Sequence, residues 1–234
     1  MFFKNKKYCH DCNLKLSKTN LQFQNFGNVS TRINDKFFTI KPSGVNLNQT
    51  NYKDYPIVSV IDGKIVSGKL KPSVDTPIHQ QIYKQFRKIG GIVHTHSHYA
   101  TVWAQANKSV PILGTTHADY WVSNVPITRK LKENEIQKKY EENIGKTIIE
   151  FFKKNKTNPI LCPGILAANH GPFAFGENSK KALLNAERIE YVSLLAFETL
   201  LLNSKSEISK TLVKKHYFRK NGKKPYYGQR IYEQ

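Results

Sequence analysis

The sequence predicts an α/β protein with three layers, α/β/α, built around a central mixed, largely antiparallel sheet. Short β-branched and aromatic runs interleave with longer segments whose apolar residues recur at helical spacing. Several of the strand-like runs are joined by tight turns such as Asp62-Gly63, which connect antiparallel neighbours. A chain of 234 residues, 39% of them hydrophobic, can bury a sizeable core, so we expect a single domain over residues 1–234.

The N-terminal half is expected to hold two helices and several short strands. A helix over residues 4–20 ends near "SKTN", and strand-like segments follow at residues 38–44, 55–62 and 64–68. A second helix runs from Pro77 to about Arg87, because proline suits a first helical turn and Asp75 or Thr76 can serve as N-cap. The next run, "GGIVHTH", reads as a buried strand.

The C-terminal half is dominated by helices around one pair of strands. Helices are expected over residues 99–107, 133–154 and 180–202, the last capped by Asn178 or Ser179. Residues 164–176, "GILAANHGPFAFG", read as a strand, a turn and a further strand. Because strands and helices alternate, helices should cover both faces of the sheet.

The formal net charge of +20 raises the question of nucleic-acid binding. The lysines are spread along the whole chain beside many Asn and Ile residues, which is typical of a compositional bias in the source genome. No helix-turn-helix, RNP-type strand or Cys/His finger is present, so we expect no specific nucleic-acid partner. The same charge would attract an anionic, phosphorylated substrate.

Cysteine content and hydropathy indicate the compartment. Cys9, Cys12 and Cys162 are too few for a disulfide framework. The stretch "CHDC" resembles half a zinc knuckle, but without a second pair we interpret it as two thiols on a helix. No apolar run is long enough for a membrane span, and the start of the chain lacks a signal peptide pattern, so we expect a cytoplasmic protein.

The stretch "GIVHTHSHYA" carries histidines at three alternate positions, 94, 96 and 98. Side chains alternate along a strand, so His94 and His96 should project to the same side. A divalent metal would bind both in their neutral form, whereas a polar strand end with solvated histidines explains the pair equally well. Adding His170, at a strand end before Gly-Pro, and Asp75, in "KPSVDTPIH", makes a ligand set suited to zinc.

Three loops of small residues accompany these ligands. "FGNVS", "KPSG" and "PSVDT" could offer backbone N–H groups and hydroxyls to a phosphate, and the last also leads into a helix N-terminus. Each loop taken singly is more simply an ordinary turn.

Taken together, these segments resemble the class II aldolase and epimerase family. The resemblance rests on "GNVS", "IKPSGV", "KPSVDTPIH", "GGIVHTHS", "TVWAQA", "GTTHADY", "HGPFAFG", "KHYFRK" and "YYGQ", in consistent order from about residue 5 to 229. "HTHS" indicates the wider family, whereas "GTTHADY" with the "YYGQ" tail indicates its epimerases. The resemblance implies a ring-shaped homotetramer with active sites shared between neighbouring subunits, and a tail of about residues 216–234 that contributes to the site.

The resemblance also implies roles for individual residues. One zinc ion per subunit, or a similar divalent metal, would be bound by Asp75, His94, His96 and His170, with His98 a non-ligand. The phosphate-binding residues would be Gly27, Asn28, Ser43, Gly44, Ser73 and Val74, where Val74 replaces a serine of the relatives. The acid/base pair would be Asp119 and Tyr227, and His216 and Arg219 would complete the site as substrate-binding residues.

The activity implied is the interconversion of L-ribulose 5-phosphate and D-xylulose 5-phosphate by retro-aldol cleavage and re-addition at C3–C4. The alternatives are an aldolase of the fuculose 1-phosphate type and a non-catalytic, adducin-like binding module. The tail and "THADY" argue against the first, and the presence of all four metal ligands argues against the second.

Overall fold

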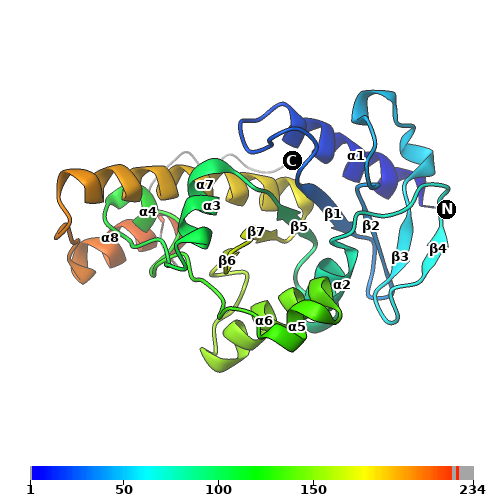
Figure 1. The fold of residues 1–234 in the computed structure, drawn as a ribbon. Coiled ribbons are helices and arrows are strands. Elements are labelled where there is room, and N and C mark those ends of the chain that lie inside the picture. The colour runs from blue at the N-terminus through cyan, green and yellow to red at the C-terminus, as the bar shows by residue number, and fades with distance from the viewer. Residues whose placement is uncertain (1, 223–224, 227–234) are drawn as a thin grey trace.

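The computed structural model describes residues 2–222 and 225–226, and their strands form one seven-stranded sheet (Figure 1). The strand order is β4-β3-β2-β1-β5-β7-β6. The strands are β1 (Asn28–Arg32), β2 (Phe37–Ile40), β3 (Ile57–Ser59), β4 (Ile65–Ser67), β5 (Gly91–His94), β6 (Gly164–Ala167) and β7 (Gly171–Gly176). All their pairings are antiparallel, and the parallel component is an isolated bridge between Ile127 and Leu166.

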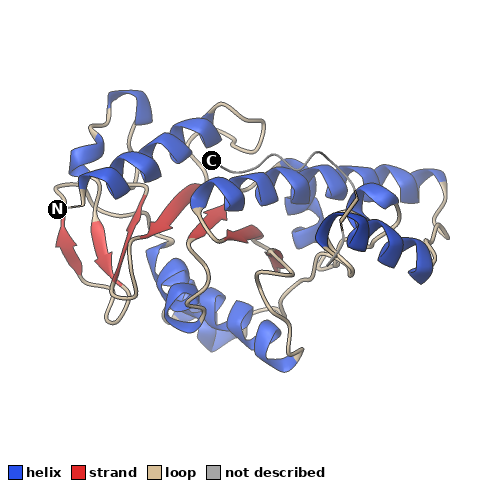
Figure 2. Cartoon of the chain, turned by 180° about the vertical axis from the view of Figure 1, so that it is seen from behind, coloured by secondary structure: helices blue, strands red, loops and turns tan. Residues whose placement is uncertain are grey.

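Helices cover both faces of this sheet, which confirms the predicted three-layer α/β class (Figures 1 and 2). They are α1 (Phe3–Ser17), α2 (Thr76–Gln85), α3 (His98–Gln105), α4 (Thr115–Ala118), α5 (Glu133–Gln137), α6 (Tyr140–Lys154), α7 (Ser179–Leu202) and α8 (Lys210–Asn221), with 3₁₀ turns η1 (Leu47–Gln49) and η2 (Tyr52–Asp54). Helices α1 and α7 lie on one face, and α2 and α6 on the other. A search of the described residues finds no helix that could span a membrane.

The central strand β1 shows how the layers are joined. Its side chains alternate, so the hydroxyl of Ser30 reaches His79 of α2 at 2.7 Å while that of Thr31 reaches Ser179 of α7 at 2.6 Å. Both faces of β1 are therefore buried, and the hydrogen bonds satisfy polar groups that burial would otherwise leave without partners.

The cysteines of α1 belong to the core. Cys9 is fully buried and its thiol donates to the carbonyl of Val29, and Cys12 is 3% exposed. Burial raises the pKa of both thiols, that of Cys12 to about 11, so neither is a thiolate at neutral pH. The interpretation of "CHDC" as two thiols on a helix agrees with this environment.

One predicted helix, residues 133–154, is wrong as a single element. The chain divides it into α5 and α6, and Lys139 between them is left-handed, with φ 55°. The side-chain amide of Asn143 donates to the carbonyls of Lys138 and Glu135, at 2.8 and 3.0 Å, and so holds the break in place. Tertiary packing of α6 against α2 overrides the continuous amphipathic pattern here.

Other boundaries also differ from the predictions. The first helix ends at Ser17 rather than residue 20, and the strand expected at 38–44 ends at Ile40, before Pro42. The stretch "FGNVS" is only partly a loop, because β1 begins at Asn28. Strand β1 and helices α4 and α8 were not predicted.

Candidate metal centre

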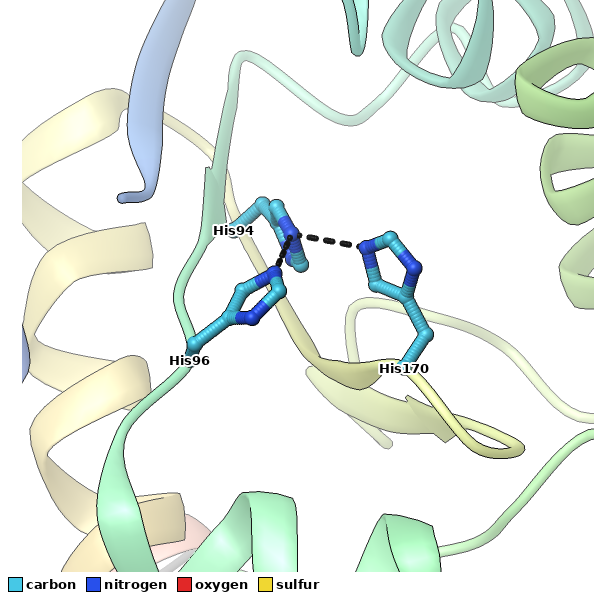
Figure 3. A group of neighbouring side chains, drawn as sticks. All are labelled: His94, His96 and His170. Atoms are coloured by element: carbon cyan, nitrogen blue, oxygen red, sulfur yellow. Dashed lines mark hydrogen bonds between the residues drawn. The ribbon is translucent and has the colours of Figure 1, made fainter. Parts of the chain in front are cut away.

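Three histidines meet where β5 ends beside the β6–β7 turn. His94 is the last residue of β5, His96 follows two residues later, and His170 directly precedes β7. Nε2 of His94 lies 3.1 Å from Nε2 of His96 and 3.0 Å from Nε2 of His170 (Figure 3). The fold thus gathers the three predicted histidines, although His170 is 76 positions from His94.

The surroundings of the three imidazoles favour their neutral form. Burial lowers the pKa of His94 well below its usual value, and the nearby His170 and His96 lower it further. Burial and His96 lower the pKa of His170 to about 4, against the opposing charge of Asp75. Burial also lowers the pKa of His96, again opposed by Asp75. Neutral imidazoles are the form that binds metal.

The geometry of the cluster fits a metal ion. Nδ1 of His94 donates to the carbonyl of Pro172 at 3.0 Å, so the lone pair of this imidazole lies on Nε2, where the other two rings converge. All three ligand nitrogens lie within 4.8 Å of one another. In a tetrahedral zinc site, Zn–N bonds of about 2.0–2.1 Å place the nitrogens roughly 3.3 Å apart. A divalent ion would therefore satisfy three lone pairs that cannot all satisfy each other.

Asp75, the fourth predicted ligand, lies outside this three-residue group. It occupies the N-cap position of α2 but makes no capping hydrogen bond, because its Oδ2 accepts one from the amide of Asn28 at 2.7 Å. Its charge nevertheless acts on the pKa of both His96 and His170. Asp75 is thus beside the cluster, and its carboxylate is directed towards Asn28.

The predicted phosphate-binding segments lie side by side next to the histidines. Asn28 is paired with His94 across β1 and β5, and its amide also reaches Ser73 Oγ at 3.2 Å. The loops that carry Ser43 and Ser73 are joined by a bridge between Pro42 and Pro72.

The remaining predicted members of these segments differ in their surroundings. Gly44 is left-handed at φ +63°, with open space around it, and the side chain of Val74 is 67% exposed. Gly27 has φ +92°, and a Cβ there would lie 2.8 Å from the carbonyl oxygen of His94. Only glycine allows this loop to approach the end of β5 so closely.

Sequence analysis missed Lys41, which is buried under the same loops. Lys41 is only 5% exposed. Its Nζ donates hydrogen bonds to the carbonyls of Asn25 and Gly27, at 2.7 and 2.9 Å. Desolvation lowers its pKa, and the nearby Asp75 raises it. The chain has many lysines, so lysine content alone does not single out Lys41. Its position directly after an apolar strand, in "FFTIKPSG", is the sequence feature that could have indicated a buried lysine.

Two aromatic residues beside the histidines were also missed. The ring of Phe26 lies 5.7 Å from that of His96, and the hydroxyl of Tyr140 lies 3.2 Å from Nδ1 of His170. His98, the first residue of α3, does not belong to the three-histidine group.

Asp119 contacts α8 rather than the histidines. Its carboxylate accepts from Arg219 at 3.0 and 3.1 Å, and lies 3.0 Å from Lys220 Nζ and 3.1 Å from His216 Nδ1. Burial would raise the pKa of Asp119, but Arg219, Lys220 and His216 outweigh it and hold the pKa below the usual value. Helices α4 and α8 lie together at one end of the molecule, away from the end of β5 (Figure 1). Tyr227 lies outside the described residues.

A groove of about 1060 Å³ lies elsewhere, between α8 and residues 109–127. Its lining is mainly apolar and includes Val122, Phe151, Val213 and Phe218. Among the predicted site residues that the structure describes, none lines this groove, so it is separate from the three histidines.

Comparison with known proteins gives close relatives. The chain is 41% identical over 227 residues to L-ribulose-5-phosphate 4-epimerase UlaF of Salmonella paratyphi B, an alignment that spans 96% of this chain and 98% of the relative. The protein of the same name from Salmonella typhi matches to the same extent.

Solved structures share the fold at lower identity. An L-fuculose 1-phosphate aldolase superposes with a TM-score of 0.75 at 21% identity, over 91% of this chain and 94% of that one. YgbL from Klebsiella pneumoniae, described as a putative aldolase/epimerase/decarboxylase, gives 0.72 at 21% identity, over 91% and 97%. The family model of the class II aldolase and adducin N-terminal domain matches residues 9–197. This match covers most of the chain, and the relatives that are 41% identical match it over nearly its full length. The chain therefore belongs to the class II aldolase and adducin N-terminal domain family.

Proposed function

We propose that this protein is an epimerase that interconverts L-ribulose 5-phosphate and D-xylulose 5-phosphate. The observation that carries the proposal is the 41% identity, over 96% of the chain, to relatives of that name. The convergence of three neutral histidines beside loops suited to phosphate supports the same chemistry.

The chemistry explains why such a site is needed. The hydrogen on C4 of the sugar is not acidic, so deprotonation cannot invert this centre, whereas breaking and reforming the C3–C4 bond can. A divalent metal, when bound, supplies Lewis-acid stabilisation of the charge that develops on the oxygens of the cleaved fragment. We propose zinc as this metal, one per subunit, with His94, His96 and His170 as ligands and Asp75 as the fourth.

The phosphate must stay bound while the C4 carbonyl turns to present its other face. We assign this role to Gly27, Asn28, Ser43, Gly44, Ser73 and the backbone N–H of Val74. Lys41, buried beneath these loops, would add positive charge to the phosphate side of the site. Tethering by phosphate makes re-addition effectively intramolecular.

Inversion needs a proton acceptor and a proton donor at the C4 oxygen, one on each face of the carbonyl. We assign these roles to Asp119 and Tyr227, with His216 and Arg219 holding Asp119. The contacts of Asp119 with α8, at a distance from the histidines of the same chain, favour a site shared between subunits. We therefore propose a ring-shaped homotetramer in which residues of about 216–234 complete a neighbour's site.

Two further assignments belong to the proposal. The chain acts as one domain over residues 1–234. Its location is cytoplasmic, because a charged phosphosugar does not cross a bilayer unaided.

The test is turnover of L-ribulose 5-phosphate by the zinc-loaded protein, with D-xylulose 5-phosphate as the expected product. His94→Asn should lose both zinc and activity while the far-UV circular dichroism spectrum is retained. Accumulation of free dihydroxyacetone and glycolaldehyde phosphate would identify an aldolase instead. Absence of any sugar-phosphate conversion by protein that holds zinc would favour a non-catalytic, adducin-like module.

A further inference from the structure

Within the described part of the chain, the contact between Tyr140 and His170 has no counterpart at His94 or His96. His94 is fixed by the carbonyl of Pro172 and stacks on Phe173, with ring centroids 4.2 Å apart and 13° between planes. His170 instead faces a phenol, since its Nδ1 lies 3.2 Å from the hydroxyl of Tyr140. When Nε2 of His170 binds a metal, the proton of the neutral ring is on Nδ1, from where it can be donated to the Tyr140 oxygen.

The backbone around Tyr140 is arranged to make this contact possible. Tyr140 is the first residue of α6 and follows Lys139, a non-glycine residue at φ 55°. Such a conformation costs roughly 1 kcal/mol and is retained only where its surroundings impose it. The sequence pattern predicts one continuous helix through residues 133–154. Such a helix would lack the change of chain direction at Lys139 that precedes Tyr140.

Asn143 is the residue that imposes the break. Its side-chain amide donates to the carbonyl of Lys138 at 2.8 Å and to that of Glu135 at 3.0 Å, and its backbone N–H donates to Lys139. These bonds satisfy carbonyls that the interrupted helix leaves without intrahelical partners. One side chain thus fixes the end of α5 relative to the start of α6.

We infer that Tyr140 is a positioning residue for the metal ligand His170, and that the break clamped by Asn143 exists to present it. Tyr140 orients the His170 ring and favours the tautomer whose Nε2 can bind metal. It does not touch substrate in this role. The inference rests on the metal site of the proposed function, but not on the identity of the sugar.

The experiment measures zinc affinity of the full-length, metal-free protein by competition with a chromophoric chelator. Tyr140→Phe removes only the hydroxyl and should weaken zinc binding about tenfold, the lower end for loss of an outer-shell partner, since Tyr140 is 36% exposed. Tyr191→Phe, a change at an exposed tyrosine of α7, is the matched control and should bind zinc as the parent does. The melting temperature of the metal-free Tyr140→Phe protein should be unchanged, which a merely structural role would not predict.

A double-mutant cycle tests the role of the break. Asn143→Ala should weaken zinc binding because it displaces Tyr140. The double variant Asn143→Ala/Tyr140→Phe should therefore bind zinc only slightly more weakly than Asn143→Ala alone. Parent-like zinc affinity in Tyr140→Phe would overturn the inference while leaving the proposed function intact. Fully additive losses would overturn the link between Asn143 and Tyr140. A parent protein that binds zinc no better than His94→Asn would overturn the metal site itself, and the inference with it.

Discussion

The side-chain amide of Asn28 donates a hydrogen bond to Asp75 over 2.7 Å, and so links a predicted phosphate-binding residue to a predicted metal ligand. A hydrogen bond to a charged group is worth about 1.5–3 kcal/mol. Asn28→Ala should therefore lower kcat/KM by about tenfold to a hundredfold. Asn28→Asp should be worse at pH 8 than at pH 6, because two adjacent carboxylates must share a proton. Equal pH profiles for Asn28→Asp and Asn28→Ala would contradict this account.

Glu190 should stabilise the helix that follows the metal-binding strand. Its carboxylate on α7 accepts hydrogen bonds from the backbone N–H groups of Tyr99 and Ala100, both at 2.9 Å, whereas the N-cap residue Ser97 makes no capping bond. Glu190→Ala should lower the free energy of unfolding by about 1–2 kcal/mol. Urea unfolding measures this, with the exposed Glu198→Ala on the same helix as control. A loss no larger than that of the control would exclude the capping role.

His79 should make the metal-free protein sensitive to acid. It is fully buried on α2, and burial lowers its pKa to about 3, with smaller effects from Asp75 and His94. An unfolded histidine titrates near pH 6.5, so between about pH 6.5 and 3 only the unfolded chain binds this proton. Stability is fully present above that window and is lost as pH falls through it, by about 1.4 kcal/mol per pH unit for this one group.

The check is urea unfolding of the metal-free protein at pH 7, 6 and 5. His79→Gln keeps a side-chain amide beside Ser30 but cannot titrate, so its stability should fall less steeply with pH. Identical slopes for the parent and His79→Gln would show that this histidine does not govern the acid response.

Arg219 should set the acid limb of the pH–activity profile. Its bidentate contact with Asp119 is a principal reason why the pKa of that carboxyl stays below its usual value despite burial. In Arg219→Gln the pKa of Asp119 should rise, so the ionised acceptor is lost at higher pH and the acid limb of kcat/KM moves upwards. Arg129→Gln, which removes an arginine paired with Glu135 and Glu150, should leave the limb in place.

Val74 should reduce affinity for the phosphate. Its side chain is 67% exposed in a loop where a hydroxyl could reach an anion. Val74→Ser should lower KM by a factor of about ten or less and change kcat little, because phosphate binding is mostly uniform along the reaction. Steady-state kinetics with L-ribulose 5-phosphate measure this, and a change in which sugar is converted would instead make the loop a determinant of specificity.

Some features of this protein follow from local sequence signals alone. Pro77 in the first turn and Asn178, whose side chain accepts from Lys181 N–H, mark the starts of α2 and α7, because capping depends on residues within one turn of each other. The alternation along "VHTH" likewise places His94 and His96 together, since the side-chain period of extended backbone is local. The three-layer class follows from the same patterns of strands and helices.

Other features were decided only by tertiary structure. His170 meets His94 because β7 pairs with β5 in one register, and such pairing is set by non-local packing. The amphipathic pattern of residues 133–154 satisfies helix physics throughout, yet Asn143 and the packing on α2 divide it at Lys139 and bring Tyr140 to His170. Asp119 pairs with Arg219 of α8, about 100 residues later in the chain. Charged residues of this kind are common on protein surfaces, and nothing in the local sequence indicates which of them will pair. Local periodicity thus determined most of the helices and strands and the paired histidines, whereas long-range pairing decided which side chains complete the site.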